Sequence, residues 1–351
     1  MLTVLHRTDI CFRDILFSTF IIILFELSSF TTPNRHGYSV QFSPFASKCL
    51  AVASSQYYGS FGGGTIFILQ VTDDGSLIQS KAIQWSDGLF DVAWSNHTDN
   101  LLISACGDGG IQLWEIDSNS NDFPLTISGY DKPTSTYYEH KEEVCSVVWS
   151  SFTQNPSFLS SSWDGSIKWW NPEYCQSLQT FTDHSSLVYE VAFAKHLKSV
   201  FASVGGDGCL KLWDTAMQQP VTSILAHPDS EVLSCDWNEH DRYIIATGGS
   251  DGLIKVWDLR NPIVPSFELY GCSYAVRRIR FSPFNSDILA SVSYDHASRI
   301  WNWQQSSNPI ETMFNHSEFN YGLNWNRLVR NQLADCGWDS LVQIFSPTCL
   351  D

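Results

Sequence analysis

Short apolar runs separated by turn-forming residues make up most of the chain. In the stretch 231–271 the runs are EVLSCDW, YIIATGG, LIKVWDL and PSFELYG, with Gly, Asp, Asn or Pro residues between them. Runs of this length that are rich in Val, Ile, Leu and Trp are typical of β-strands rather than helices. The stretch therefore predicts four short strands joined by tight turns.

This four-strand pattern recurs along the sequence. An Asp, usually followed by Gly, separates the second run from the third, and a Trp or Phe follows six positions later. The aspartates are Asp108, Asp164, Asp207, Asp251, Asp295 and Asp339, and a degenerate first copy has Gly63 in their place. Successive copies lie 45, 56, 43, 44, 44 and 44 residues apart. The longest interval contains an insertion within 118–136, whose composition favours a surface loop.

A period of this length, with four strands, an Asp-Gly turn and a Trp-Asp end, resembles the WD repeat. Seven copies predict an all-β, seven-bladed WD-repeat β-propeller that forms one domain over residues 29–351. The last copy ends after its third strand, in SLVQIFSPTCLD. We expect an N-terminal strand near LSSFTTPNR to close the ring, because joining the two ends of the chain removes an open sheet edge.

The leader, residues 1–28, departs from the repeat. Its apolar run ILFSTFIIILF (Ile15–Phe25) is shorter than the roughly 20 residues that a membrane-spanning helix needs. No basic segment precedes the run, which disfavours a signal peptide. We interpret the leader as an artefact of the gene model or an extension of the closing strand, and expect no direct membrane span.

The recurring Asp has a structural explanation. Asp-Gly favours a tight hairpin turn, because Gly accepts the positive φ that the turn requires. In the WD family a His, a Ser or Thr, the turn Asp and a Trp form a hydrogen-bonded tetrad. The resemblance assigns this role to His140, Ser160, Asp164 and Trp170; to His184, Ser203, Asp207 and Trp213; and to His227, Thr247, Asp251 and Trp257. Three copies are expected to be incomplete: the second lacks the His, the sixth has Tyr270 in its place, and the seventh has Asp335 for the Ser.

Composition narrows the functional classes. The chain has 37 Asp and Glu residues against 20 Lys and Arg residues, which gives a net charge of −17. This charge argues against a nucleic-acid partner and favours a cationic one. The alternative is that the acidity only aids solubility. Ten cysteines without a C-x-x-C pair suggest reduced thiols in the cytosol. The sequence contains no nucleophile elbow, Walker loop or H-E-x-x-H motif. We therefore expect no enzyme activity, cofactor or metal site.

Binding is expected on one face of the ring. In WD propellers one face gathers the residue before the turn Asp and the residues that enter the first strand. At these positions the candidate binding residues are Asp87, Phe90, Glu143, Cys145, Trp163, Tyr189, Glu231, Tyr294, Tyr321 and Trp338. An aromatic floor with an acidic rim suits an amphipathic helix with basic side chains. The alternative is that the aromatic residues merely pack between blades.

Several strings resemble one family, the receptors for the type-2 peroxisomal targeting signal. They include RHGYSVQFSPF, DGLFDVAWS, LSCDWN, VWDLRNP, ADCGWD and, in the degenerate first copy, SSQYYGSFGGGTIFIL. The resemblance implies a cytoplasmic import receptor that binds the N-terminal amphipathic helix of thiolase-like cargo proteins. It also implies an import co-receptor, peroxisomal docking proteins, and cycling between cytoplasm and peroxisome. The alternative is a general WD-repeat scaffold or substrate adaptor, in a ubiquitin ligase or a chromatin complex.

Overall fold

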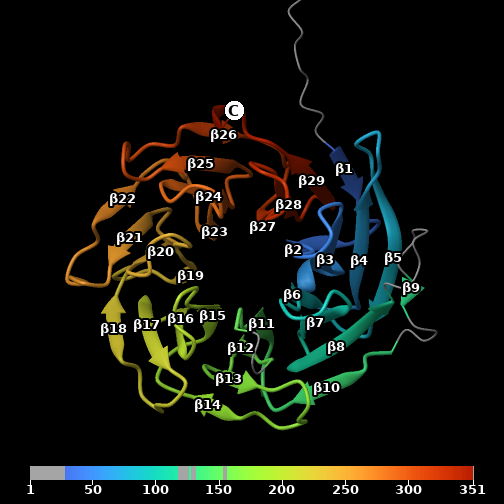
Figure 1. The fold of residues 1–351 in the computed structure, drawn as a ribbon, viewed down its shortest axis with the longest axis horizontal. Helices are drawn as coiled ribbons and strands as arrows, with labels where there is room; N and C mark the ends of the chain where they lie inside the picture. Colours follow the sequence, from blue (N-terminus) through green and yellow to red (C-terminus); the bar gives the residue numbers. More distant parts are fainter. Residues whose placement is uncertain (1–27, 118–125, 128–131, 153–155, 351) are drawn as a thin grey trace, which may run out of the picture.

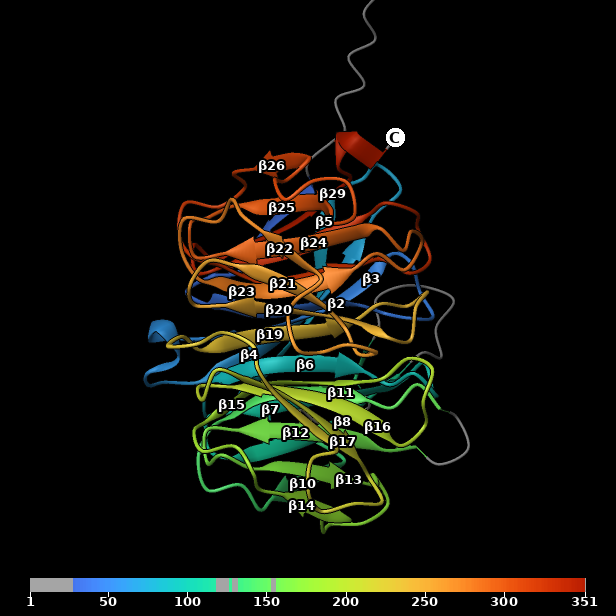
Figure 2. The ribbon, with the colours of Figure 1, turned by 90° about the vertical axis from the view of Figure 1, so that its left-hand side faces the viewer.

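The computed structural model describes residues 28–117, 126–127, 132–152 and 156–350. Within these ranges the chain forms seven antiparallel sheets, which Figure 1 shows as the blades of a closed ring. Seen from the side, the ring is a thick disk with loops at both faces (Figure 2). The predicted all-β, seven-bladed propeller is confirmed.

The first four blades follow one another along the chain, each running from an inner to an outer strand. Blade 1 contains β2 (His36–Phe42), β3 (Cys49–Ser55), β4 (Gly64–Val71) and β5 (Leu77–Trp85). Blade 2 contains β6 (Leu89–Trp94), β7 (Leu101–Cys106), β8 (Gly110–Asp117) and β10 (Ser135–Tyr138), with β9 (Thr126–Ile127) also paired to β8. Blade 3 contains β11 (Val144–Trp149), β12 (Phe158–Ser162), β13 (Ile167–Trp170) and β14 (Gln179–Phe181). Blade 4 contains β15 (Val188–Phe193), β16 (Val200–Gly205), β17 (Cys209–Asp214) and β18 (Thr222–Leu225).

The last three blades complete the circle. Blade 5 contains β19 (Val232–Trp237), β20 (Ile244–Gly249), β21 (Ile254–Asp258) and β22 (Phe267–Leu269). Blade 6 contains β23 (Val276–Phe281), β24 (Ile288–Ser293), β25 (Ser298–Asn302) and β26 (Glu311–Met313). Blade 7 contains β27 (Asn320–Trp325), β28 (Leu333–Gly337), β29 (Leu341–Phe345) and β1 (Ser28–Thr31). Two short 3-10 turns, η1 (Tyr57–Gly59) and η2 (Thr348–Leu350), interrupt the strand pattern.

The N-terminal strand closes the ring as predicted. β1 runs antiparallel to β29, with Ser28 opposite Ile344 and Thr31 opposite Leu341. The ring of Phe30 lies 5.9 Å from that of Phe67 in blade 1, so the closing strand also packs against the next blade. The preceding part of the leader, 1–27, lies outside the described residues, as do 118–125 and 128–131 of the insertion in blade 2.

The hydrophobic core is divided among the interfaces between blades. Each of seven clusters of buried apolar side chains joins two neighbouring blades: 1 with 2, 2 with 3, and so on to 7 with 1. The repeated Trp of the third strand belongs to these clusters, as Trp213 does between blades 3 and 4. Each sheet therefore buries both faces, and a single blade could not form this core alone.

The inner strands are linked around the channel by side chains. An inner strand has a free edge, and its unpaired N–H groups need acceptors. The carboxylate of Asp91 accepts from the Val147 N–H of the next blade at 3.0 Å. Asp236 accepts in the same way from Phe281 at 2.8 Å. These buried acids therefore serve the fold.

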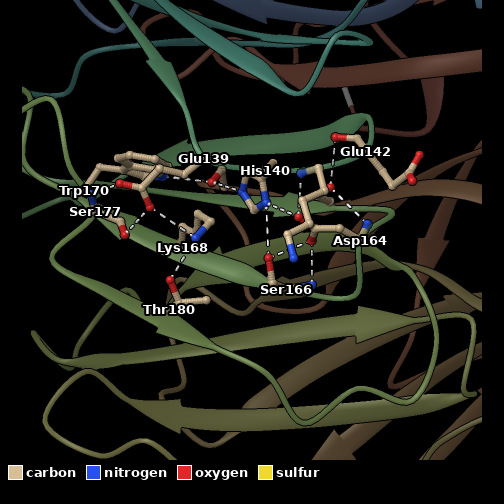
Figure 3. Close-up of polar contacts among 12 residues, drawn as sticks. Glu139, His140, Glu142, Asp164, Ser166, Lys168, Trp170, Ser177 and Thr180 are labelled. Atoms are coloured by element: carbon tan, nitrogen blue, oxygen red, sulfur yellow. Dashed lines mark hydrogen bonds and ion pairs between the residues drawn. The ribbon is translucent and has the colours of Figure 1, made fainter.

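The tetrads of blades 3, 4 and 5 form hydrogen-bonded chains; Figure 3 shows that of blade 3. His140 Nδ1 lies 3.0 Å from Asp164 Oδ2, and its Nε2 lies 2.7 Å from Ser160 Oγ. Trp170 Nε1 donates to the same Ser160 oxygen at 2.8 Å. Burial alone would raise the pKa of Asp164, but the hydrogen bonds from His140 and Ser166 outweigh it and hold this pKa well below its usual range. The carboxylate thus stays ionised as a fixed acceptor.

Blade 6 corrects one expectation from the sequence. Tyr270 does not replace the His, because its hydroxyl donates to Glu268 on the exterior. Instead, Arg299 binds Asp295 through two nitrogen atoms, each 2.8 Å from one carboxylate oxygen. The turn Asp of blade 6 therefore still has a hydrogen-bonded partner, supplied by the third strand of its own sheet.

Blade 7 places one imidazole between two carboxylates. His316 Nδ1 lies 2.9 Å from Asp339, and His316 Nε2 lies 3.1 Å from Asp335, which occupies the Ser position. Burial would lower the pKa of His316, but the negative charges of Asp335 and Asp339 prevail and raise it to about 9. The closing blade therefore contains a buried imidazolium at neutral pH.

Removing the tetrad oxygen should destabilise the protein. Ser160→Ala leaves the buried His140 and Trp170 nitrogen atoms without their partner, which costs about 1–3 kcal/mol for each unsatisfied group. We expect a lower melting temperature in circular dichroism. Ser161→Ala is the matched control, because the neighbouring Ser161 hydroxyl is buried without a hydrogen-bond partner among the described residues and its loss should leave melting unchanged. Equal melting of the two variants would contradict the structural role of the tetrad.

Stability should also depend on the charge of His316. Its folded-state pKa of about 9 exceeds the ordinary 6.5, so its contribution is complete below pH 6.5 and is lost as the pH rises through about 9. An NMR titration of the imidazole should therefore have its midpoint near 9. Asp335→Ser, which restores the usual tetrad residue, should lower that midpoint toward 6.5. A midpoint near 6.5 in the unmodified protein would show that the pair of carboxylates does not act this way.

Candidate functional site

A β-bulge in every inner strand defines the entrance to the central channel. In each of the seven pairings between first and second strands, the register skips one inner-strand residue. A bulge re-aims the side chain of the extra residue. The seven bulge residues, called the bulge ring below, are Tyr38, Phe90, Cys145, Tyr189, Leu233, Arg277 and Tyr321.

Members of the bulge ring from different blades meet one another. The ring of Tyr38 lies 5.0 Å from that of Phe90 and 4.7 Å from that of Tyr321. The guanidinium of Arg277 lies over the Tyr321 ring, 4.2 Å from its centre. Side chains far apart in the sequence thus form a floor at one end of the channel.

The turn residues lie at the same end as the bulge ring. In each of blades 2 to 7, the residue before the turn Asp donates its N–H to a carbonyl in the loop that enters the inner strand. The Trp163 N–H, for example, donates to the Glu143 carbonyl at 3.0 Å, and that of Ser250 donates to Glu231 at 2.9 Å. Every blade has the same strand order, so these pairs encircle one face, called the mouth below.

The structure joins four of the six candidate aromatic residues into one network. Phe90 contacts Tyr38, which contacts both Tyr321 and Trp338. Tyr321 and Trp338 stack with ring centres 5.6 Å apart, and Tyr294 lies 5.8 Å from Tyr321. These contacts make a continuous apolar floor from blade 2 through blades 1 and 7 to blade 6.

The other two candidate aromatic residues lie apart from this network. Among the described residues, neither Trp163 nor Tyr189 has a ring contact with it. Trp163 is 45% exposed on the turn of blade 3. The Tyr189 hydroxyl donates to Glu231 at 2.9 Å and holds that carboxylate at the edge of the mouth.

The acidic residues at the mouth carry uncompensated charge. Asp87, Glu143, Glu231 and Glu318 lie in loops that enter the inner strands, and we call them the acidic rim. Within the described ranges none of the four forms an ion pair. Among the described residues, the Asp87 carboxylate accepts a hydrogen bond from the Gly88 N–H, and the Glu231 carboxylate accepts one from the Tyr189 hydroxyl. Ser250 bonds the main chain of Glu231 and not its carboxylate. The rim therefore offers negative charge to a partner.

Two acids deeper in the channel form ion pairs with arginines instead. A cavity of about 440 Å³ lies beyond the bulge ring along the inner strands. Its lining includes Asp91, Glu190, Arg278 and Arg280. Arg278 lies 3.3 Å from Asp91, and Arg280 lies 2.7 Å from Glu190. The first pair links blades 6 and 2 and the second links blades 6 and 4, so this part of the channel stabilises the fold.

Cys145 belongs to the bulge ring but has little exposed surface. Its side chain is 6% exposed, and burial raises the pKa of the thiol far above its usual value. The thiol is therefore neutral at physiological pH and unsuited to nucleophilic or metal chemistry.

The described residues also contain no cluster of three or more His, Cys, Asp or Glu side chains placed to hold a metal ion. None of the helices in these ranges is long and apolar enough to cross a bilayer.

Blade 1 adds mouth residues that the sequence analysis did not single out. The η1 turn projects from one face of the disk, in blue in Figure 2. Tyr58 of this turn stacks on His36 at 3.9 Å and lies 5.2 Å from Trp338. Gly59 has a φ of +72°, and a Cβ there would lie 2.6 Å from the Phe90 ring. The irregular string SSQYYGSFGGG was the available signal, but its position over the mouth depends on the fold.

Comparisons with known proteins agree with this architecture. A family model described as "WD domain, G-beta repeat" matches residues 131–171, 175–214 and 218–258. Three similar proteins share the name peroxisomal targeting signal 2 receptor. The chain is 40% identical to the Homo sapiens protein, over 91% of this chain and 95% of that protein. It is 39% identical to the Mus musculus protein, over 91% of this chain and 96% of that protein. It is 31% to that of Saccharomyces cerevisiae, over 88% of this chain and 96% of that protein. The chain therefore belongs to the family of peroxisomal targeting signal 2 receptors.

Proposed function

We propose that this protein is a peroxisomal import receptor that binds the type-2 targeting signal of its cargo proteins at the mouth. The observation that carries the proposal is an acidic rim, which forms no ion pair within the described ranges, around a continuous aromatic floor. A basic amphipathic helix has the complementary surface, with apolar side chains on one face and cations beside them. The family membership supplies the biological context, because the relatives are named for this signal.

The floor and the rim contribute differently to binding. Burial of apolar helix side chains on the floor stabilises the complex by roughly 25 cal/mol per Å². The rim carboxylates attract and orient the basic side chains, which affects association rate and selectivity more than affinity. The aromatic rings contact one another across blades, so they are ordered before the helix arrives and lose little entropy on binding.

The finer parts of the proposal follow from the family. The receptor binds thiolase-like cargo in the cytoplasm and delivers it, together with an import co-receptor, to docking proteins of the peroxisome. The protein then cycles between the cytoplasm and the peroxisome. A general scaffold or substrate adaptor would be expected to bind disordered basic peptides as well as it binds a signal helix.

Reversing the charge of the rim should weaken signal binding. Glu143→Lys combined with Glu231→Lys places cations where the basic helix docks, and we expect roughly tenfold weaker binding of a synthetic type-2 signal peptide. Fluorescence anisotropy at low and high salt measures this loss. Glu173→Lys is the control, because Glu173 is exposed between β13 and β14 at the opposite end of its blade. Unchanged affinity in the rim variant would contradict the role of the rim.

Trp163 should contribute to binding but not to folding. Its ring is 45% exposed at the mouth, so Trp163→Ala should leave the melting temperature unchanged. The same substitution should weaken binding of the signal peptide by a factor on the order of ten. Tyr174→Ala is a matched control, since Tyr174 is 56% exposed in the same blade but beyond β13, at the other face. Equal affinity of the two variants would exclude Trp163 from the site.

A further inference from the structure

Loops at the face opposite the mouth carry a local positive charge. The strands of each sheet are antiparallel, so the loop that leaves an inner strand lies at the other face of the disk in Figure 2. In blades 4 to 7 these loops are 194–199, 238–243, 282–287 and 326–332, called the basal patch below. Five cations and three acids lie in the patch: Lys195, Lys198, Arg242, Arg327 and Arg330, with Glu239, Asp241 and Asp287. The patch is therefore positive in a chain whose net charge is −17.

Three of the four loops meet at this end of the channel. The lining of the 440 Å³ cavity includes Lys195, Glu239 and Arg327. Glu239 of blade 5 forms an ion pair with Arg327 of blade 7, and it lies 3.9 Å from Lys195 of blade 4. One carboxylate thus faces two cations from different blades and neutralises their charge only in part.

The other three cations of the patch keep their full charge. Among the described residues, no ion pair is formed by Lys198, Arg242 or Arg330. All three side chains are exposed, and the guanidinium of Arg242 lies over the ring of the neutral Tyr243, 4.7 Å from its centre. The patch therefore offers positive charge to an acidic partner.

Exposed apolar side chains lie among these cations. Leu197 is 39% exposed and directly precedes Lys198. Leu328 and Val329 are 50% and 38% exposed, with an arginine on each side of the pair in the sequence. Apolar side chains flanked by cations complement a segment that has an apolar face with carboxylates beside it.

The loop of blade 7 is fixed in the conformation that presents its apolar pair. The buried side chain of Asn326 accepts hydrogen bonds from the N–H groups of Leu328 at 3.0 Å and Val329 at 3.2 Å. Its amide nitrogen donates to the Ser47 carbonyl of blade 1 at 2.8 Å. The loop is therefore ordered before a partner arrives, which reduces the entropy lost on binding.

We propose that the basal patch binds an acidic amphipathic segment of a partner protein. The apolar side chains of that segment cover Leu197 and Leu328, and its carboxylates lie beside Lys198 and Arg330. This second docking surface lies opposite the mouth, so it remains accessible while the mouth holds a signal helix. An anionic membrane also has the required charge, but the net charge of the whole chain opposes it, whereas a short acidic segment meets only the patch.

Charge reversal in the patch tests this proposal. The probes are two synthetic amphipathic helices with the same Leu face, one with Glu and one with Lys along its edges, measured by fluorescence anisotropy. We expect the unmodified protein to bind the Glu helix, and Lys198→Glu and Arg330→Glu each to weaken it roughly fivefold. Lys132→Glu is the matched control, because Lys132 is exposed in blade 2, before β10. Thermal melting of each variant shows whether the fold is intact.

Separate measurements with the type-2 signal peptide distinguish this inference from the proposed function. Arg330→Glu should leave the affinity for the signal peptide unchanged, and Trp163→Ala should leave the affinity for the Glu helix unchanged. If the signal peptide fails to bind but the Glu helix binds as expected, the proposed function is wrong and the basal patch stands.

Three results would overturn the proposal. The first is failure of the folded protein to bind the Glu helix, and the second is a Glu helix whose binding responds to Trp163→Ala but to neither patch variant. The third is a patch that serves another partner instead. Binding to phosphatidylserine vesicles, or self-association in analytical ultracentrifugation, that Arg330→Glu abolishes without any binding of the Glu helix would show this.

Discussion

The structure depends on the closure of a ring in which every sheet buries both of its faces against its neighbours. The seven apolar clusters lie between blades rather than within them, so each blade needs two partners. The pairing of β1 with β29 supplies the last contact and covers an edge that would otherwise be exposed. Closure thus joins residues at opposite ends of the chain and holds the inner strands in place around the channel.

The closed ring gives similar residues different roles at different depths. Asp91 and Glu190 lie in the channel, where arginines neutralise them and where they accept N–H groups from neighbouring inner strands. Glu143 and Glu231 lie instead in the loops that enter the inner strands of blades 3 and 5, at the mouth, and within the described ranges neither forms an ion pair. The negative charge therefore acts differently at the two depths: arginines neutralise it in the channel, whereas the rim presents it at the mouth.

Much of the framework could be predicted from the sequence. The repeated Asp and aromatic positions indicated seven blades, and the missing last strand indicated closure by the N-terminal segment. These inferences succeed because each blade repeats one local pattern of strands and turns. The replacement for the sixth His could not be found in this way: Tyr270 lies near the expected position, but Arg299 binds Asp295 from a neighbouring strand.

The amino-acid pattern alone predicts the number of blades, the order of their strands and which positions share the face with the turn residues. The folded ring sets how those positions combine: Phe90, Tyr321 and Trp338 join through Tyr38, Cys145 is buried, and Arg277 lies over the Tyr321 ring. The physical reason is that hydrophobic periodicity and turn chemistry act within one blade. Contacts across the channel arise between blades, after the ring has brought distant residues together.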